Sequence, residues 1–197
     1  MRFSRIILAT NNIHKIREMS QLLADLQVEV LSKRDFPDFP DIEETGTTLA
    51  ENALLKARAI YARYGIPAVA DDTGLEVAHL NGGPGVLSAR YAGAGCSFAD
   101  NNRKLLAELA GVPSAQRGAR FVTVIAISYE GGDQIVEGAV EGFIAERNRG
   151  ENGFGYDPVF VYPPTGETFA EMGAVQKNSI SHRGRALVKL REWLLSE

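Results

Sequence analysis

The hydrophobic and polar positions of the chain follow two kinds of pattern. Ile6–Ala9 and Val28–Leu31 are short, mostly apolar runs of the kind found in buried strands. Between them, Ile16–Leu26 carries apolar residues three and four positions apart, which predicts a helix with one buried face. The chain therefore opens with a predicted strand, a helix and a second strand.

The same patterns continue to the end of the chain. Thr48-x-x-Glu51 and Ser97-x-x-Asp100 match capping boxes, so a helix is expected to begin at each of them. The other predicted elements are strands at Pro67–Asp72, Arg120–Tyr129, Gln134–Glu146 and Val159–Tyr162, and a last amphipathic helix that begins at Ser181.

Gly131-Gly132-Asp133 lies between the two longest strand patterns and predicts a hairpin turn. Strands that alternate with helices and are followed by a hairpin indicate an α/β (α+β) protein, in which helices flank a mixed sheet. The long antiparallel hairpin in the second half is expected to help form a second lobe, with a central substrate cleft between the lobes. Because no linker interrupts the sequence, 1–197 is expected to be a single domain.

Composition narrows the class of protein. Of 197 residues, 45% are hydrophobic and 23% are charged, which is typical of a folded globular protein. The net charge of −4 argues against general binding of nucleic acid or of an anionic membrane, so neither partner is expected. Without a signal-peptide pattern or a run of about 20 apolar residues, a cytoplasmic location is expected. The lone Cys96 excludes an internal disulfide.

Asp71 and Asp72 are the most informative residues of the chain. They follow an apolar stretch directly and are followed by Thr73 and Gly74. Paired carboxylates at the end of a core strand are suited to hold a divalent metal ion or to activate a water molecule. The alternative is a polar turn in which these carboxylates cap backbone N–H groups.

Two predicted helix starts carry bases where acids are expected, since the N-terminus of a helix is itself positive. Lys15 and Arg17 lie at the first of these starts, and Arg183 lies at the last one. An anion such as phosphate would account for both arrangements, with Thr10-Asn11 supplying further donors. The alternative is that these long side chains point into solvent.

Two loops carry further candidate residues. Glu43-Glu44 could add oxygen ligands for Mg²⁺, or could belong to a solvated acidic loop. Phe154 lies between two glycines and could stack on a flat base, while Asp157 could accept hydrogen bonds from it. Alternatively, Phe154 and Tyr156 attach their loop to the core.

Five segments stand in order along the chain: ATNNIHK (9–15), EETGTTLAENALLKA (43–57), ADDTGL (70–75), GFGYDPVF (153–160), and Lys177 with SHRGRA (181–186). Together they closely resemble the ITP/XTP pyrophosphatase family, which hydrolyses non-standard purine nucleoside triphosphates. The resemblance covers essentially the whole chain. It implies a two-lobed α/β fold, Mg²⁺ as cofactor, a nucleoside triphosphate substrate and a homodimer.

The resemblance also implies roles for individual residues. Glu43 and Asp72 match the metal positions, although Glu44 is adjacent and spacing does not choose between the two glutamates. Asp72 matches the general base, and Lys15 and Asp71 are taken as catalytic with it. The substrate contacts that the resemblance implies are Thr10, Asn11, Asn12, Ile13, His14, Lys15, Thr73, Phe154, Gly155, Tyr156, Asp157, Lys177, His182 and Arg183.

The hypothesis is therefore hydrolysis of ITP, dITP and XTP to the monophosphate and pyrophosphate. Asp72 would deprotonate the attacking water, supported by Asp71, and Lys15 would neutralise phosphate charge. Arg183 would favour bases with an oxygen at C6 over adenine, whose amino group would leave the guanidinium without a partner. Two alternatives stay open: a related pyrophosphatase for modified pyrimidine triphosphates, and a nucleotide-binding module without catalysis.

Overall fold

The computed structural model describes residues 2–196. Its helices are α1 (Ile13–Leu23), α2 (Leu49–Tyr64), α3 (Phe98–Glu108), α4 (Ala174–Ile180) and α5 (His182–Leu195). Its strands are β1 (Arg5–Leu8), β2 (Glu29–Leu31), β3 (Ala68–Val77), β4 (Pro84–Gly85), β5 (Gly118–Tyr129), β6 (Gly132–Ile144), β7 (Phe160–Tyr162) and β8 (Glu167–Thr168). Within the described residues, none of these helices combines the length and apolar character that a membrane span requires.

The strands are hydrogen-bonded in the order β2-β1-β3-β5-β6-β7-β8, and β4 pairs with β3 off this path. The first strands, β1 with β2 and β1 with β3, run parallel. The pairs β3–β4, β6–β7 and β7–β8 are antiparallel. The prediction of an α/β protein with a mixed sheet and a long hairpin, β5–β6, in the second half is therefore confirmed.

The chain divides into two compact units, each built from separate segments of sequence. Unit 1 comprises Met1–Asp72, Thr123–Gly138 and Arg183–Glu197, and unit 2 comprises Thr73–Val122 and Ala139–His182. The three strands β3, β5 and β6 contribute residues to both units. Each unit has its own hydrophobic core, so each is described by itself.

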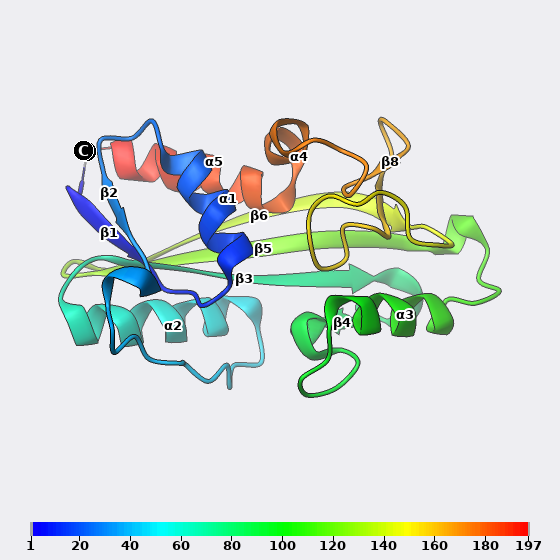
Figure 1. The fold of residues 1–197 in the computed structure, drawn as a ribbon, viewed down its shortest axis with the longest axis horizontal. Helices are drawn as coiled ribbons and strands as arrows, with labels where there is room; N and C mark the ends of the chain where they lie inside the picture. Colours follow the sequence, from blue (N-terminus) through cyan, green and yellow to red (C-terminus); the bar gives the residue numbers. More distant parts are fainter. Residues whose placement is uncertain (1, 197) are drawn as a thin grey trace. The chain divides into compact units, whose positions relative to one another are not determined.

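In unit 1, helices cover both faces of the strands (Figure 1). The helices α1 and α5 lie on one face, where their apolar residues meet Ile6, Leu8 and Val69. The helix α2 lies on the other face and buries Ala57 and Ile60. Side chains alternate between the faces of a strand, so this layering follows from the apolar runs that predict β1 and β3.

The core of unit 2 is rich in aromatic residues. Phe160 packs against both Phe121 and Phe169, with ring centroids 4.8 and 5.0 Å away. Leu105 from α3 and Tyr156 from the loop before β7 belong to the same cluster. Tyr156, Val159 and Phe160 thus attach the Gly-rich segment 153–160 to this core.

Both predicted capping boxes are present. At the start of α2, the Thr48 hydroxyl accepts from the Glu51 N–H while the Glu51 carboxylate accepts from the Thr48 N–H, and Ser97 and Asp100 do the same for α3. The helix α4 and the strands β4 and β8 are absent from the sequence-based predictions. Each of them is too short for a periodic pattern to identify.

The prediction that the strand before Thr73 ends at the two acids is wrong. The strand β3 continues to Val77, so Asp71 and Asp72 lie within it. Its neighbour β1 pairs with it only through Ile7–Ala68 and Leu8–Val69 and then ends. The acids are therefore presented because the adjacent parallel strand stops before them, not because their own strand does.

Candidate functional site

Asp71 is the centre of a buried group of charges in unit 1. Lys15 Nζ lies 3.1 Å from Asp71 Oδ1, and Arg183 Nε and Nη2 each donate to Asp71 Oδ2 at 3.2 Å. Arg183 Nη1 donates to Glu18 Oε2 at 2.5 Å. Asp71 thus connects the start of α1, which carries Lys15, to the start of α5, which carries Arg183.

These charges act on one another strongly because they are removed from water. Burial by itself would raise the pKa of the Asp71 carboxyl, but the charges of Lys15, Arg183 and Lys56 outweigh burial and hold the pKa below its ordinary value. Burial lowers the pKa of Lys15, and the attraction of Asp71 opposes that effect. Asp71 is therefore a fixed anion that compensates buried cations.

The bases at the two helix starts now have a structural explanation. The Lys15 side chain is 14% exposed and that of Arg183 is 3% exposed, so the idea that they point into solvent is wrong for both. They turn toward the same carboxylate, Asp71. Arg17, in contrast, is exposed. Within unit 1, Lys15 and Arg183 thus share Asp71 as their counter-ion, and Arg17 is not part of this group.

Asp72 is held by two residues from one face of α2. Asn52 Nδ2 donates to Asp72 Oδ2 at 3.2 Å, and Lys56 Nζ lies 3.6 Å from Asp72 Oδ1. Asn52 and Lys56 are four positions apart, so they lie on the same face of the helix, about one turn from each other. Lys56 Nζ also donates to the Asp71 carbonyl oxygen at 2.8 Å. The carboxylate of Asp72 therefore has a set orientation rather than capping a turn.

Glu44, rather than Glu43, belongs to this group. Lys56 Nζ lies 2.6 Å from Glu44 Oε1, and the negative charge of Glu44 acts on Asp72. Glu43 is exposed. Spacing in the sequence leaves the two glutamates equivalent, and the fold brings Glu44 to the same lysine as Asp72.

Burial raises the pKa of the Asp72 carboxyl, and the nearby charge of Glu44 raises it further against the opposing effect of Lys56. For Lys56, burial would lower the pKa, but Asp72, Asp71 and Glu44 together raise it. A carboxyl whose pKa is shifted upward beside a retained cation is a common feature of catalytic sites.

The donor set of Glu44 and Asp72 fits a small divalent cation. Both carboxylates lie near one cation, Lys56 Nζ, which balances their charge in this structure. Mg²⁺ is usually held in proteins by one or two carboxylates together with waters and substrate phosphates. Within residues 2–196, no group of three or more His, Cys, Asp or Glu side chains is arranged to hold a metal. A metal ion at Glu44 and Asp72 would thus be coordinated in its other positions by water or by a bound small molecule.

The segment Thr10–Lys15 covers the end of the β1–α1 connection and the first residues of α1, and its own side chains order it. Asn12 is the N-cap: its Oδ1 accepts from the His14 N–H at 2.9 Å and from the Lys15 N–H at 3.3 Å. The Asn12 N–H donates to Thr10 Oγ1 at 3.2 Å, and the Asn11 amide donates to the Asp41 carboxylate. Ile13 and His14 are exposed.

A second group of predicted site residues lies in unit 2. Asp157 Oδ2 accepts from Lys177 Nζ and from the Phe154 N–H, both at 2.7 Å. Lys177 Nζ also lies 5.1 Å from the centroid of the Phe154 ring. A Cβ on Gly153 would lie 2.0 Å from Asp157 Oδ2, which explains the glycine at that position. The Asp157–Lys177 pair thus shapes the loop that presents Phe154.

Other predicted contacts in unit 2 differ in their surroundings. Tyr156 is buried in the core, and its hydroxyl donates to the Ser88 carbonyl oxygen at 2.9 Å. Tyr156 therefore attaches its loop to the core, as the alternative interpretation of the sequence expected. His182 is buried and stacks on Phe121 with ring centroids 4.3 Å apart. Gly155 accepts at its carbonyl from the Asn102 amide at 3.0 Å. Thr73 directly follows Asp72 on β3 and is half-buried.

Sequence reasoning missed three residues of the unit 1 group: Asn52, Lys56 and Glu18. A signal was present for the first two. Asn52 and Lys56 lie at the buried positions of α2, among Leu49, Ala53 and Ala57, where a helix normally carries apolar residues. A buried polar residue requires partners, and here those partners are the acids of β3 and the loop that carries Glu44. Glu18 carried no comparable signal.

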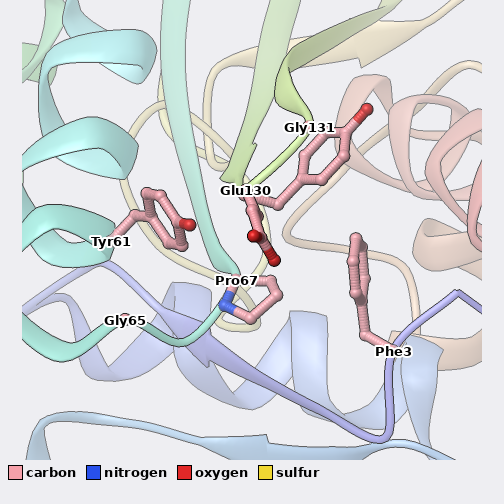
Figure 2. Close-up of a pocket in the computed structure, with 7 residues that line it drawn as sticks. Phe3, Tyr61, Gly65, Pro67, Glu130 and Gly131 are labelled. Atoms are coloured by element: carbon pink, nitrogen blue, oxygen red, sulfur yellow. The ribbon is translucent and has the colours of Figure 1, made fainter.

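Unit 1 also contains a cavity of about 480 Å³ away from these charges. Figure 2 shows the rings of Tyr61 and Phe3 on either side of Pro67 and the Glu130 side chain. Pro67 precedes β3, whereas Asp71 and Asp72 lie further along that strand. None of the predicted site residues lines this cavity, so it is separate from the candidate site.

The fold and the charged group in unit 1 define an α/β protein that presents a buried acid–base cluster just beyond the end of a parallel strand, a frequent place for ligand sites in such sheets. The family model that matches residues 6–193 is that of the Ham1 family, and the chain belongs to this family. The resemblance drawn from the five sequence segments is thereby confirmed.

Curated relatives and solved structures support this assignment. The chain is 53% identical to a dITP/XTP pyrophosphatase of Geobacillus kaustophilus over 95% of this chain and 92% of that protein. It is 48% identical to a dITP/XTP pyrophosphatase of Thermoanaerobacter sp. over 97% and 96%. A HAM1 protein from Coxiella burnetii has a similar structure, with a TM-score of 0.88 and 45% identity over 96% of this chain and 98% of the other. The Ham1 protein of Staphylococcus aureus gives a TM-score of 0.86 at 42% identity, over 96% of this chain and 97% of the other.

Proposed function

We propose that this chain hydrolyses dITP, ITP and XTP to the corresponding monophosphate and pyrophosphate, and so removes non-standard purines from the nucleotide pool. The observation that carries the proposal is the arrangement around Lys56, where the carboxylates of Asp72 and Glu44 face one cation beside the Asp71–Lys15 pair. Relatives with nearly the same length and about half of the residues identical are named dITP/XTP pyrophosphatases.

Mg²⁺ is proposed as the cofactor, held by Glu44 and Asp72. When bound, it would supply a Lewis acid that neutralises charge on the phosphates. Glu44 replaces Glu43 in this proposal because Glu44 shares Lys56 with Asp72 and Glu43 is exposed.

Asp72 is proposed as the general base. Its raised pKa brings its basicity closer to that needed to take a proton from water, and Asn52 and Lys56 hold its two oxygens in a set orientation. Lys15 would neutralise negative charge on the substrate phosphates, and Asp71 would keep the Lys15 ammonium in place. The water would attack the α-phosphorus, and pyrophosphate would leave.

The nucleoside is proposed to contact the residues that the family resemblance assigns to it: Thr73, Phe154, Gly155, Tyr156, Asp157, Lys177, His182 and Arg183. Phe154 is half-buried and has the flat ring that can stack on a base. Arg183 would favour an oxygen at C6 of the purine, which hypoxanthine and xanthine carry and adenine lacks. A homodimer and a cytoplasmic location belong to the same proposal.

The alternative of a non-catalytic nucleotide-binding module is less well supported. Asp71, Asp72 and Glu44 would repel a triphosphate unless a metal or an adjacent base intervened. Burial also raises the pKa of the Asp72 carboxyl, a direction of shift that is frequent among catalytic carboxyls. The pyrimidine alternative would keep the metal and phosphate residues. It would differ in the residues that contact the base, so substrate comparison separates it.

The test is an incubation of the purified protein with dITP, XTP, ATP, GTP and dTTP in Mg²⁺, followed by separation of the products. Monophosphate and pyrophosphate from dITP and XTP, with little product from the other nucleotides and none with a chelator, is the expected result. Diphosphate and orthophosphate would place the attack at the γ-phosphorus and refute the mechanism. Binding without turnover of any nucleotide would favour the binding module.

A further inference from the structure

Asn52 is completely buried in α2 and joins two segments that carry the acids of the candidate metal site. Its Oδ1 accepts from the Gly46 N–H at 2.8 Å, and its Nδ2 donates to Asp72 Oδ2 at 3.2 Å. Gly46 lies two residues after Glu44 in the same loop. One amide therefore connects the loop of Glu44 directly to Asp72.

The orientation of this amide is dictated by chemistry. A backbone N–H can only donate, so the Asn52 oxygen has to face Gly46, and its NH₂ group is left to face the carboxylate acceptor. No other side chain of the same size supplies an acceptor on one side and a donor on the other. Aspartate at this position would place two carboxylates together, and leucine would leave both partners without a hydrogen bond.

The loop closes tightly on the amide. A Cβ on Gly46 would lie 2.7 Å from Asn52 Oδ1 and 2.7 Å from the Glu51 Cβ. Gly46 does not have a positive φ, so the glycine is required by the close approach and not by its backbone conformation. The Gly46–Asn52 contact thus holds the Glu44 loop close to α2, together with the bonds from Thr47 to Glu51 and from Lys56 to Glu44.

We infer that Asn52 is a positioning residue, which orients Asp72 and fixes the loop of Glu44 so that both carboxylates face the same divalent cation. This inference rests on the proposed function, because it concerns the metal site of that reaction. Lys56, one turn further along α2, contacts Glu44 and Asp72 through its ammonium group. Asn52 acts on the same two segments without occupying the space between the carboxylates.

The experiment measures Mn²⁺ binding to the full chain without nucleotide by electron paramagnetic resonance, with Mn²⁺ in place of Mg²⁺. The variants are Asn52→Leu, Asn52→Asp and Gly46→Ala, the last of which displaces the amide while leaving Asn52 in place. The matched control is Asn101→Leu: Asn101 is also a buried helical asparagine bonded to backbone groups, but it lies in unit 2. Loss of a group that orients a metal ligand typically weakens metal binding about 10- to 100-fold.

The expected result is a Kd for Mn²⁺ that rises by about 10-fold or more in the three variants and stays unchanged in Asn101→Leu. Wild-type affinity in Asn52→Leu, Asn52→Asp and Gly46→Ala would overturn the inference, as would an equal loss in the control. If Asn52→Leu does not fold, the other two variants decide. The inference is also overturned if the wild-type protein binds no Mn²⁺. If the protein binds Mn²⁺ in this Asn52-dependent way but cleaves no nucleotide, only the proposed function is refuted.

Discussion

Lys15 Nζ lies 3.1 Å from Asp71 Oδ1, although the two residues belong to different elements and are far apart in the sequence. The carboxylate is inaccessible to solvent and also accepts two hydrogen bonds from Arg183. A lysine at the start of a helix is unfavourable by itself, since the helix N-terminus is positive. Asp71 offsets this repulsion and fixes the ammonium close to the candidate general base.

The first prediction concerns this ion pair. Asp71→Asn removes the charge that compensates Lys15 and Arg183, and breaking one partner of a buried charged group typically costs about 3–5 kcal/mol. A decrease of that order in the free energy of unfolding is expected from urea titration. Asp25→Asn is the control, because Asp25 pairs with Arg191 in the same unit but is 70% exposed, and little change is expected there. Equal effects of the two substitutions would contradict the assigned role of burial.

The second prediction separates the two adjacent glutamates. Glu44→Gln removes a carboxylate that faces the same cation as Asp72, so the Mg²⁺ concentration for half-maximal dITP hydrolysis is expected to rise by about 10-fold or more. Glu43→Gln alters an exposed side chain and is expected to shift that concentration little. A larger shift in Glu43→Gln than in Glu44→Gln would instead identify Glu43 as the metal ligand.

The third prediction tests the general base. Asp72→Asn keeps the size of the side chain and its place on β3 but removes the group that takes the proton. Turnover of dITP is expected to fall by about 100-fold or more, a typical loss for a positioned acid or base, while circular dichroism shows an intact fold. A folded Asp72→Asn protein with near-normal turnover would eliminate Asp72 from this role.

The fourth prediction concerns selectivity. If Arg183 recognises the oxygen at C6, Arg183→Ala should reduce the ratio of kcat/KM for dITP over dATP by about 5-fold or more, because an unmatched buried polar group costs about 1–3 kcal/mol. Asp71→Asn disturbs the same network without removing the guanidinium and serves as the comparison. An unchanged ratio in Arg183→Ala would limit Arg183 to holding Asp71 and Glu18.

The fifth prediction is a pH dependence at the start of α3. Two hydrogen bonds from Ser97 lower the pKa of Asp100 to about 2, and the bond from the Ser97 hydroxyl has a larger effect than the bond from its N–H. Because the folded pKa is below the unfolded value of about 3.9, the capping box contributes stability above the unfolded pKa and loses it as the pH falls toward 2. The difference in Tm between wild type and Asp100→Ala should therefore shrink between about pH 5 and pH 2. A difference that is constant over this range would contradict the lowered pKa.

Local chemistry explains why several elements could be predicted from the sequence. The capping boxes at Thr48 and Ser97 depend on residues three positions apart, and both form as expected. The apolar runs at β1 and β5 depend only on burial, and these strands form within about two residues of their predicted bounds. The five ordered segments identify the family because each keeps chemically distinctive residues at fixed spacing.

The tertiary structure decided what the sequence left open, because those questions concern contacts between distant segments. Asp71 and Asp72 are adjacent in sequence, but successive side chains of a strand point to opposite faces. Asp71 accordingly meets Lys15 and Arg183, while Asp72 meets Asn52 and Lys56. In the same way, the position of Lys56 on α2 pairs it with Glu44, and for this reason Glu44 is proposed as the metal ligand in place of Glu43. Composition and spacing determined which chemistry the chain carries, and only the packing of helices against both faces of the strands determined which groups act together.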